Sequence, residues 1–306
     1  MQQIVGILIV LGSVFGGFFM MGGSFHQIWQ PIELIVIAGA GLGALVIGNP
    51  THVLVEMMTQ IKKIITKKKY DSEFQRQLLL LMYELLQLAA GGLKALDAHV
   101  EAPKDSPLFQ RYPRVLEEPK LLAFIVDNFR LMAMGKINAH ELEGVLEQEL
   151  EAIHSELEQP AKSLGKIGEA MPGFGILAAV LGIVITMNTV NEGATSGEIA
   201  EHVGAAMVGT FIGIFFCYGI IDPLCNMMKQ LVNSEGSNKE TVKVVLVTHV
   251  AGKPPLLAID AGRRLVALNI KPSFAQLERW INDLEGRDNA PADDSSRRGG
   301  RGAKAA

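Results

Sequence analysis

The sequence predicts an all-α integral membrane protein with four transmembrane helices, a large helical cytoplasmic loop and a cytoplasmic C-terminal region. Three observations carry this prediction. The chain of 306 residues is 49% apolar with a mean hydropathy of +0.26. Its apolar residues gather in four blocks with few or no charges, separated by long charged stretches. Lysine flanks these blocks on one side only.

Each block approaches the roughly 20 residues that a helix needs to cross about 30 Å of hydrocarbon. The first block, 4–21, has no Lys or Arg before it and no clear small-residue cleavage site after it, so we interpret it as a retained span and not a signal peptide. The others cover 32–55, 171–190 and about 202–224. Glycine-rich interiors in four such blocks argue against buried helices of a soluble core.

The positions of Lys and Arg predict how the spans are oriented, because cytoplasmic loops carry an excess of these residues. Five lysines follow the second block within residues 62–69 and three follow the fourth within 229–243, whereas the links 22–30 and 191–201 contain neither Lys nor Arg. We therefore expect both termini and nearly all of the polar mass to be cytoplasmic.

The expected organisation has five parts. They are spans 1 and 2 over residues 1–58, a helical loop over 59–170, spans 3 and 4 over 171–228, a C-terminal region over 229–285 and a disordered tail over 286–306. The tail is rich in Gly, Asp, Arg and Ser and lacks core-forming residues. A net charge of −4 gives no global attraction to nucleic acid.

Local signals predict helices through the loop and the C-terminal region. Residues 75–96 are rich in good helix formers, with two consecutive glycines that interrupt them. Asn138 and Glu141 form a predicted capping box for a helix that runs to residue 158. Residues 239–251 have a β-like composition but equally fit a continuation of the fourth span. Ser273 is predicted to cap a final helix over 274–284.

No catalytic constellation is present in the sequence. The seven histidines show no metal-ligand spacing, and neither a phosphate-binding loop nor a nucleophile elbow occurs. Cys217 and Cys225 lie on one predicted helix with their Cα atoms about 12 Å apart, too far for a mutual disulfide. The sequence therefore predicts a protein that is not an enzyme and has no cofactor.

Polar residues within the blocks are few, and such residues are costly in lipid and often functional. They include Glu33, Thr186, Asn188, Thr210 and Asp222. The two acids fall near opposite membrane faces, where each is expected to reach the interface. With no carboxylate at mid-depth, an ionisable group for proton or cation transport has to come from another chain.

Two prolines, Pro172 and Pro223, stand at the predicted cytoplasmic ends of the third and fourth spans. Each removes a backbone donor and permits a bend. Two interpretations fit these prolines. They mark the ends of helices, or they form a paired hinge between the membrane helices and the loop.

Several glycine- and proline-containing motifs occur at the ends and in the interiors of the predicted spans. Gln-Pro-Ile-Glu-Leu at 30–34 runs into Ala-Gly-Ala-Gly at 38–41. The third span begins with Pro-Gly-Phe-Gly at 172–175, and the fourth contains Met-Val-Gly-Thr-Phe-Ile-Gly-Ile at 207–214. Taken in order, these motifs resemble the MotA family of flagellar motor stator subunits. The likeness covers nearly all of residues 1–285 and includes the arrangement of two spans, a loop and two spans.

This resemblance implies a mechanism in the bacterial inner membrane. Members of the family form a ring, thought to hold five copies, around a dimer of a MotB-like partner. The partner contributes a membrane helix with an essential aspartate and a peptidoglycan-binding domain. Ions pass between the partner helix and the third and fourth spans. Their flow would rotate the ring, whose cytoplasmic loop pushes the rotor protein FliG.

The resemblance also implies roles for individual residues. Thr210, Ala179 and Thr186 would line the ion path, and Pro172 and Pro223 would couple ion flow to loop movement. Sodium-driven relatives have a threonine at the position of Ala179. Because an alanine methyl cannot replace water lost by a sodium ion, we expect the transported ion to be H⁺.

The charges expected to face the rotor match the family less well. The family usually has an arginine where this sequence has Ala98, and its glutamate corresponds best to Asp105. The rotor-contact candidates are therefore Lys94, His99, Glu101 and Asp105. Solvated loop charges are the simpler alternative for each of them.

Two other functions are weighed against the stator. A TolQ- or ExbB-like, proton-driven energiser of outer-membrane processes would have three spans and a differently placed loop, so the paired N-terminal spans disfavour it. A small-solute transporter would need internal binding groups or inverted repeats, and the sequence shows neither.

Overall fold

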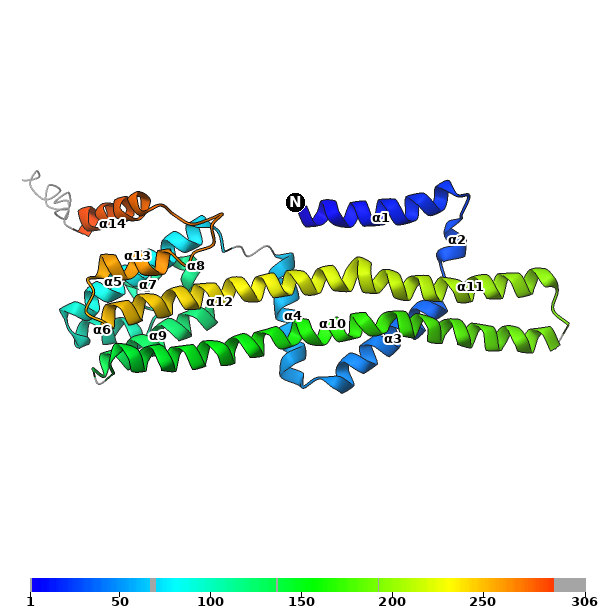
Figure 1. Cartoon of the computed structure of the whole chain (residues 1–306), viewed down its shortest axis with the longest axis horizontal. Helices are drawn as coiled ribbons and strands as arrows, with labels where there is room; N and C mark the ends of the chain where they lie inside the picture. Colours follow the sequence, from blue (N-terminus) through cyan, green and yellow to red (C-terminus); the bar gives the residue numbers. More distant parts are fainter. Residues whose placement is uncertain (1, 67–69, 136, 192, 289–306) are drawn as a thin grey trace, which may run out of the picture. The chain divides into compact units, whose positions relative to one another are not determined.

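The computed structural model describes residues 2–66, 70–135, 137–191 and 193–288, and every regular element within these ranges is a helix. The chain divides into two compact units. We call residues 1–68 and 151–236 the span unit, and residues 69–150 and 237–306 the loop unit. Two helices, α10 (Ala139–Asn191) and α12 (Asp222–Val250), contribute residues to both (Figure 1).

The span unit contains the apolar helices. They are α1 (Gln2–Met20), α2 (Phe25–Ile28), α3 (Pro31–Gly48), α4 (Thr51–Ile65), α10 from Glu151, α11 (Ser196–Phe215), the π-helical η1 (Phe216–Ile221) and α12 up to Gly236. Three stretches within the described residues are long and apolar enough to cross a membrane: Phe25–Gly48, Ala139–Asn188 and Ser196–Val250. The first predicted span is an apolar helix too, but its described apolar part, Val5–Met20, is shorter.

Helix α10 is longer than the sequence suggested. We expected a loop helix ending near residue 158 and a separate span from 171, but one helix of 53 residues runs through both Pro160 and Pro172. A proline inside a helix removes one hydrogen bond and bends the helix without obliging it to end. The predicted loop–span junction is therefore continuous helix.

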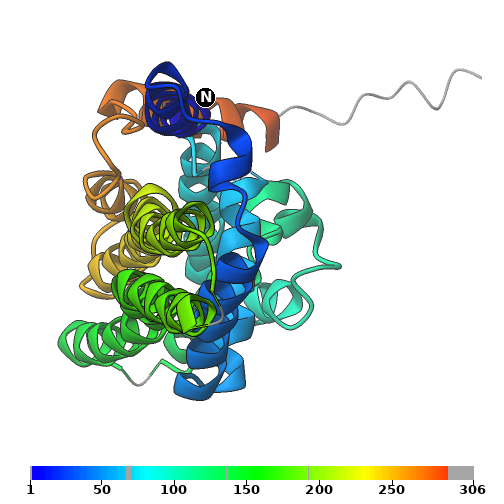
Figure 2. The same ribbon diagram turned by 90° about the vertical axis from the view of Figure 1, so that its right-hand side faces the viewer.

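Within the span unit, α10 and α11 run side by side, as both views show (Figures 1 and 2). Helix α4 crosses the direction of α10 (Figure 1). A core of small and medium side chains joins these helices with α3. Its buried members include Ile37, Met57, Ala161, Leu164, Met171, Ala178, Ile212, Cys217, Ile221, Cys225 and Met228.

The loop unit is a cluster of shorter helices around α5 (Ser72–Gly91). The others are α6 (Leu93–Val100), α7 (Pro107–Gln110), α8 (Pro113–Leu116), α9 (Pro119–Ala133), the first part of α10, the second part of α12, α13 (Pro255–Arg263) and α14 (Phe274–Asp288). Residues 78–86 of α5 are all buried. The glycine pair ends α5 as expected, because Gly92 adopts a φ of +121° that favours glycine.

Other local predictions are confirmed or corrected. The capping box forms, since the backbone N–H of Glu141 donates to Asn138 Oδ1 at 2.9 Å and that of Asn138 donates to Glu141 Oε2 at 3.3 Å. Residues 239–250 continue α12 and are not a strand. Ser273 caps α14, but this helix extends to Asp288, so residues 286–288 are helical and not part of a disordered tail. The rest of the predicted tail lies outside the described residues.

Candidate functional site

Glycines set how closely α10 and α11 approach in the span unit. A Cβ atom on Gly213 would lie 2.5 Å from the carbonyl oxygen of Met171, and one on Gly175 would lie 2.8 Å from the carbonyl oxygen of Gly209. Farther along the pair, a Cβ on Gly182 would lie 3.1 Å from Ala206 Cβ. The two backbones therefore touch, as in helix pairs that associate through small residues in membranes. We call this contact the glycine crossing.

Two of the predicted ion-path residues lie beside the glycine crossing. Thr210 is half-buried on α11, and its Cα is 3.2 Å from the Cβ position of Gly175. Ala179 is half-buried on α10 and follows Ala178, whose Cβ is 3.4 Å from the Cβ position of Gly209. The structure thus brings these two positions to neighbouring parts of one helix pair.

The third predicted ion-path residue, Thr186, has a different setting. Its side chain is fully buried, and its hydroxyl donates to the carbonyl oxygen of Gly182 at 2.8 Å. This bond to the helix's own backbone is common for threonine in membrane helices. Thr186 is nearer to the tip of the α10–α11 hairpin than Ala179 is.

The two prolines differ in their surroundings. Pro172 is an interior residue of α10, next to Met171, whose carbonyl oxygen faces Gly213. Pro223 is exposed and lies in the first turn of α12, with only Asp222 between it and the π-helical η1. Such segments interrupt the regular hydrogen-bond pattern of a helix and are frequent at functional sites. Both prolines therefore stand where the backbone pattern of their helix is interrupted.

Polar contacts fasten α4 to the long helices of the span unit. Lys63 Nζ lies 2.6 Å from Glu235 Oε1, and the Glu235 side chain is 8% exposed. Gln60 Nε2 donates to the carbonyl oxygen of Leu157 at 2.9 Å. An ion pair that is largely removed from solvent holds its geometry better than an exposed pair does. These contacts fix α4 against α10 and α12.

The rotor-contact candidates all belong to α6 and the turns after it in the loop unit. Glu101 and Asp105 are exposed, and the Asp105 N–H donates to the carbonyl oxygen of Ala102 at 3.1 Å. His99 is half-buried, with Nδ1 at 2.7 Å from Ser106 Oγ. Lys94 is a residue of α6, and its side chain lies outside the described residues.

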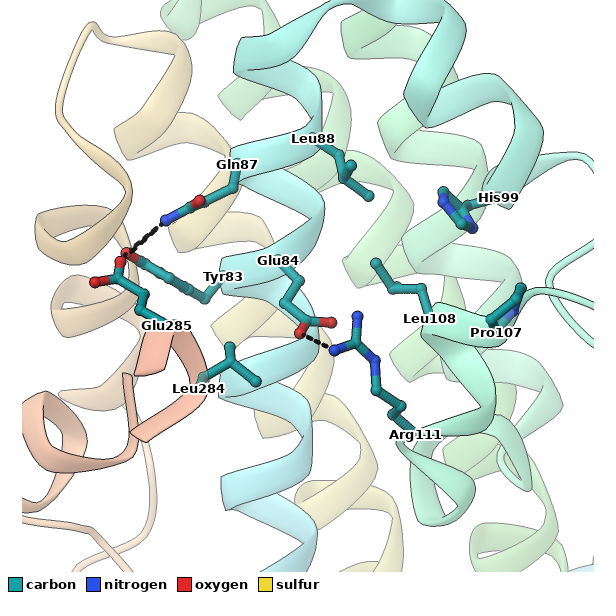
Figure 3. A pocket seen from close by; sticks show the side chains of 10 residues that line it. All are labelled: Tyr83, Glu84, Gln87, Leu88, His99, Pro107, Leu108, Arg111, Leu284 and Glu285. Carbon is teal, nitrogen blue, oxygen red and sulfur yellow. Dashed lines mark hydrogen bonds and ion pairs between the residues drawn. The ribbon is translucent and has the colours of Figure 1, made fainter. Parts of the chain in front are cut away.

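A cavity of about 250 Å³ opens beside His99 (Figure 3). From one wall, Tyr83 and Gln87 of α5 point toward Glu285 of α14; from the other, Glu84 of α5 pairs with Arg111 (Figure 3). The Arg111 Nη1–Glu84 Oε1 distance is 2.9 Å, and the Glu84 side chain is 7% exposed. Sequence reasoning missed this pair, because nothing local marks Glu84 as an inward-facing position of α5.

The Tyr83 hydroxyl is the most strongly hydrogen-bonded group of the cavity wall toward α14. It donates to Glu285 Oε1 at 2.6 Å. Burial, together with this bond to a carboxylate, raises the pKa of Tyr83 to about 12. The phenol is therefore a fixed hydrogen-bond donor at neutral pH. Among the described residues, no group of three or more His, Cys, Asp or Glu is placed to hold a metal ion.

Comparison with known proteins places the chain in a family. Residues 4–92 match the model of the motility protein A N-terminal region, and residues 119–241 match that of the MotA/TolQ/ExbB proton channel family. The chemotaxis protein LafT of Vibrio parahaemolyticus is 50% identical over 94% of this chain and 100% of its own. Motility protein A of Escherichia coli is 37% identical over 93% of this chain and 96% of its own.

The fold is shared with a solved structure as well. The flagellar MotAB stator complex from Bacillus subtilis contains a chain that superposes with a TM-score of 0.63 at 22% identity, over 90% of this chain and 98% of that one. At this identity the match supports the fold alone. Together with the relatives of 37–50% identity, it leads to one conclusion: this chain belongs to the MotA family, within the MotA/TolQ/ExbB proton channel proteins.

Proposed function

We propose that this chain is a stator subunit of the bacterial flagellar motor. Several copies, five by our expectation, form a ring around a dimer of a MotB-like partner, and the two proteins together make a proton channel that drives torque on the rotor protein FliG. The observation that carries the proposal is the 50% identity, over 94% of this chain, to a relative named chemotaxis protein. The protein acts as a channel and motor subunit and not as an enzyme.

The apolar helices and the lysines support the proposed membrane topology. In this proposal the three long apolar stretches, together with the shorter apolar helix α1, are the four spans of the inner membrane. The lysines after α3 and on α12 support an orientation with both termini in the cytoplasm. The loop unit is then cytoplasmic, where rotor proteins are accessible.

The glycine crossing supports an ion path along α10 and α11. The glycines let α10 and α11 meet backbone to backbone, and Thr210 and Ala179 flank this contact. The partner supplies the essential aspartate through which ions pass. The Ala179 methyl offers no oxygen ligand, so the transported ion is H⁺.

Coupling to the rotor uses the prolines and the loop unit. Pro172 and Pro223 are the hinges, because each interrupts backbone hydrogen bonding in a helix that contributes residues to both units. Glu101 and Asp105 are the strongest rotor-contact candidates because they are exposed. His99 and Lys94 belong to the same helix, α6.

The alternative is a TolQ- or ExbB-like energiser, which the second family model includes by name. The N-terminal match over residues 4–92 is to motility protein A alone. That match favours the stator.

The test is complementation of motility. A flagellated strain that cannot swim because its own stator genes are deleted receives this chain and its MotB-like partner. Its swimming speed is then measured. We expect swimming that a protonophore abolishes and that external sodium does not affect. Failure of the wild-type pair to restore swimming contradicts the stator function, and a speed that follows sodium contradicts H⁺ as the ion.

A matched pair of variants tests the path. Thr210→Val removes a hydroxyl beside the glycine crossing at nearly constant volume, and we expect slower swimming with normal membrane insertion. Thr59→Val is the control, because Thr59 is exposed on α4 and its hydroxyl donates to its own helix at 2.9 Å. Equal speeds in the two variants would remove Thr210 from the path.

A further inference from the structure

Glu33 is the acid in the first turn of α3. Its side chain is half-buried in the span unit, and its Cγ lies 3.5 Å from the position that a Cβ on Gly209 would take. Ala178 Cβ lies 3.4 Å from the same position. The Glu33 side chain thus enters a notch between α10 and α11.

The notch exists because small residues line it. Any side chain larger than hydrogen at position 209 would contact both Ala178 and Glu33. The residues next in sequence to the two notch residues are Ala179 and Thr210, about 1.5 Å of helix rise away. The only acid of α3 therefore contacts α11 at Gly209, the residue before Thr210, opposite Ala178, the residue before Ala179.

The Glu33 carboxylate has no partner among the residues that the structure describes: neither a hydrogen bond nor an ion pair engages it. An ionisable group in a membrane helix that lacks a partner is costly, and such groups commonly mark ion or proton pathways. Its place in the first turn of α3 offers partial compensation, because a helix N-terminus favours negative charge. That compensation does not explain why the side chain is directed at α11.

We propose that Glu33 is a second proton-binding site of the ion path, supplied by this chain and not by the partner. A hydronium ion gives its proton to the Glu33 carboxylate, forming an O–H bond and releasing water. That O–H bond breaks when the proton passes to the next base, a water molecule or the partner's carboxylate. Glu33 returns to its charged form, so each cycle takes up one proton and releases one proton. This inference rests on the proposed function and deepens it.

The experiment measures proton flux through the purified complex with its partner, reconstituted in liposomes that contain a pH-sensitive dye. Glu33→Gln keeps the shape of the side chain and removes its titration, and we expect flux to fall by roughly tenfold or more. Glu33→Asp keeps titration, and flux should stay near that of the wild type. Glu201→Gln is the control, since Glu201 is an exposed acid of α11.

Each outcome decides the matter. Wild-type flux in assembled Glu33→Gln complexes overturns the proposal. If Glu33→Gln fails to co-purify with the partner, Glu33→Asp decides, because an assembled aspartate complex without flux shows a packing role only. A wild-type complex that conducts no protons would instead contradict the proposed function, so the two failures are distinguishable.

Discussion

The closest helix contact of the span unit is made by small residues, whereas the central helix of the loop unit is packed by large ones. At the glycine crossing, α10 and α11 meet backbone to backbone, with Gly213 against the Met171 carbonyl and Gly175 against that of Gly209. In the loop unit, α5 is surrounded instead by large side chains, and residues 78–86 are buried without interruption. Phe109 and Phe129 are fully buried in the same unit.

The difference follows from the two solvents. In water, burying a large apolar side chain is favourable in proportion to its area, so a central helix lined with leucines organises its neighbours. Between lipid tails this gain vanishes, and helix association relies on close van der Waals contact that small residues permit. The charged residues do not follow this division, because ion pairs with at least one buried partner occur in both units: Glu84–Arg111 and Asp260–Arg263 in the loop unit, and Lys63–Glu235 in the span unit.

The largest effect is expected where the loop unit depends on side-chain volume. Phe129→Ala removes a ring with 0% exposure from α9 and should cost about 3–5 kcal/mol. We expect a fall of roughly 10 °C in the thermal unfolding midpoint, measured by circular dichroism in detergent. Leu268→Ala, at a position 89% exposed, is the control and should leave the midpoint unchanged. Similar shifts for both variants would mean that α9 does not contribute to the core.

A smaller effect is expected where the span unit depends on the absence of side chains. Gly213→Ala places a methyl group 2.5 Å from a backbone oxygen and should destabilise the helix pair by about 1–3 kcal/mol. Gly204→Ala lies on the same helix with no heavy atom within 4 Å of the added Cβ. The thermal unfolding midpoint and the swimming speed should both fall for Gly213→Ala and stay unchanged for Gly204→Ala. A tolerated Gly213→Ala would show that α10 and α11 separate readily.

The smallest effect concerns a buried charge of the loop unit. Burial alone would raise the pKa of the Asp260 carboxyl, but hydrogen bonds from Arg263 at 2.7 Å and Arg264 at 3.0 Å outweigh it and hold the pKa below its ordinary value of 3.8. The stability that this carboxylate contributes is therefore present above pH 3.8 and lost as pH falls through the lowered pKa.

That dependence can be measured against Asp260→Asn. The difference in unfolding midpoint between wild type and variant should be largest near about pH 6 and should shrink once pH drops below the ordinary carboxyl pKa. A difference that is constant with pH would mean that Asp260 contributes shape and not charge.

Local structure could be read from the sequence because its causes are local. The break at Gly92 and the capping box of Asn138 and Glu141 each arise within a few residues of one another. The run of α10 through Pro160 and Pro172 was missed, since a proline marks the end of a helix only when no packing holds the helix together.

What the sequence determined by itself was the helical class, the apolar spans, the lysine asymmetry and the motifs of the family. These depend on composition and on spacing along one chain. Tertiary structure alone decided which glycine meets which carbonyl, that Glu84 pairs with Arg111, and that Glu33 enters the notch at Gly209. Such contacts join residues far apart in the chain, and side-chain direction in a packed helix pair depends on how two backbones cross, which no single segment specifies.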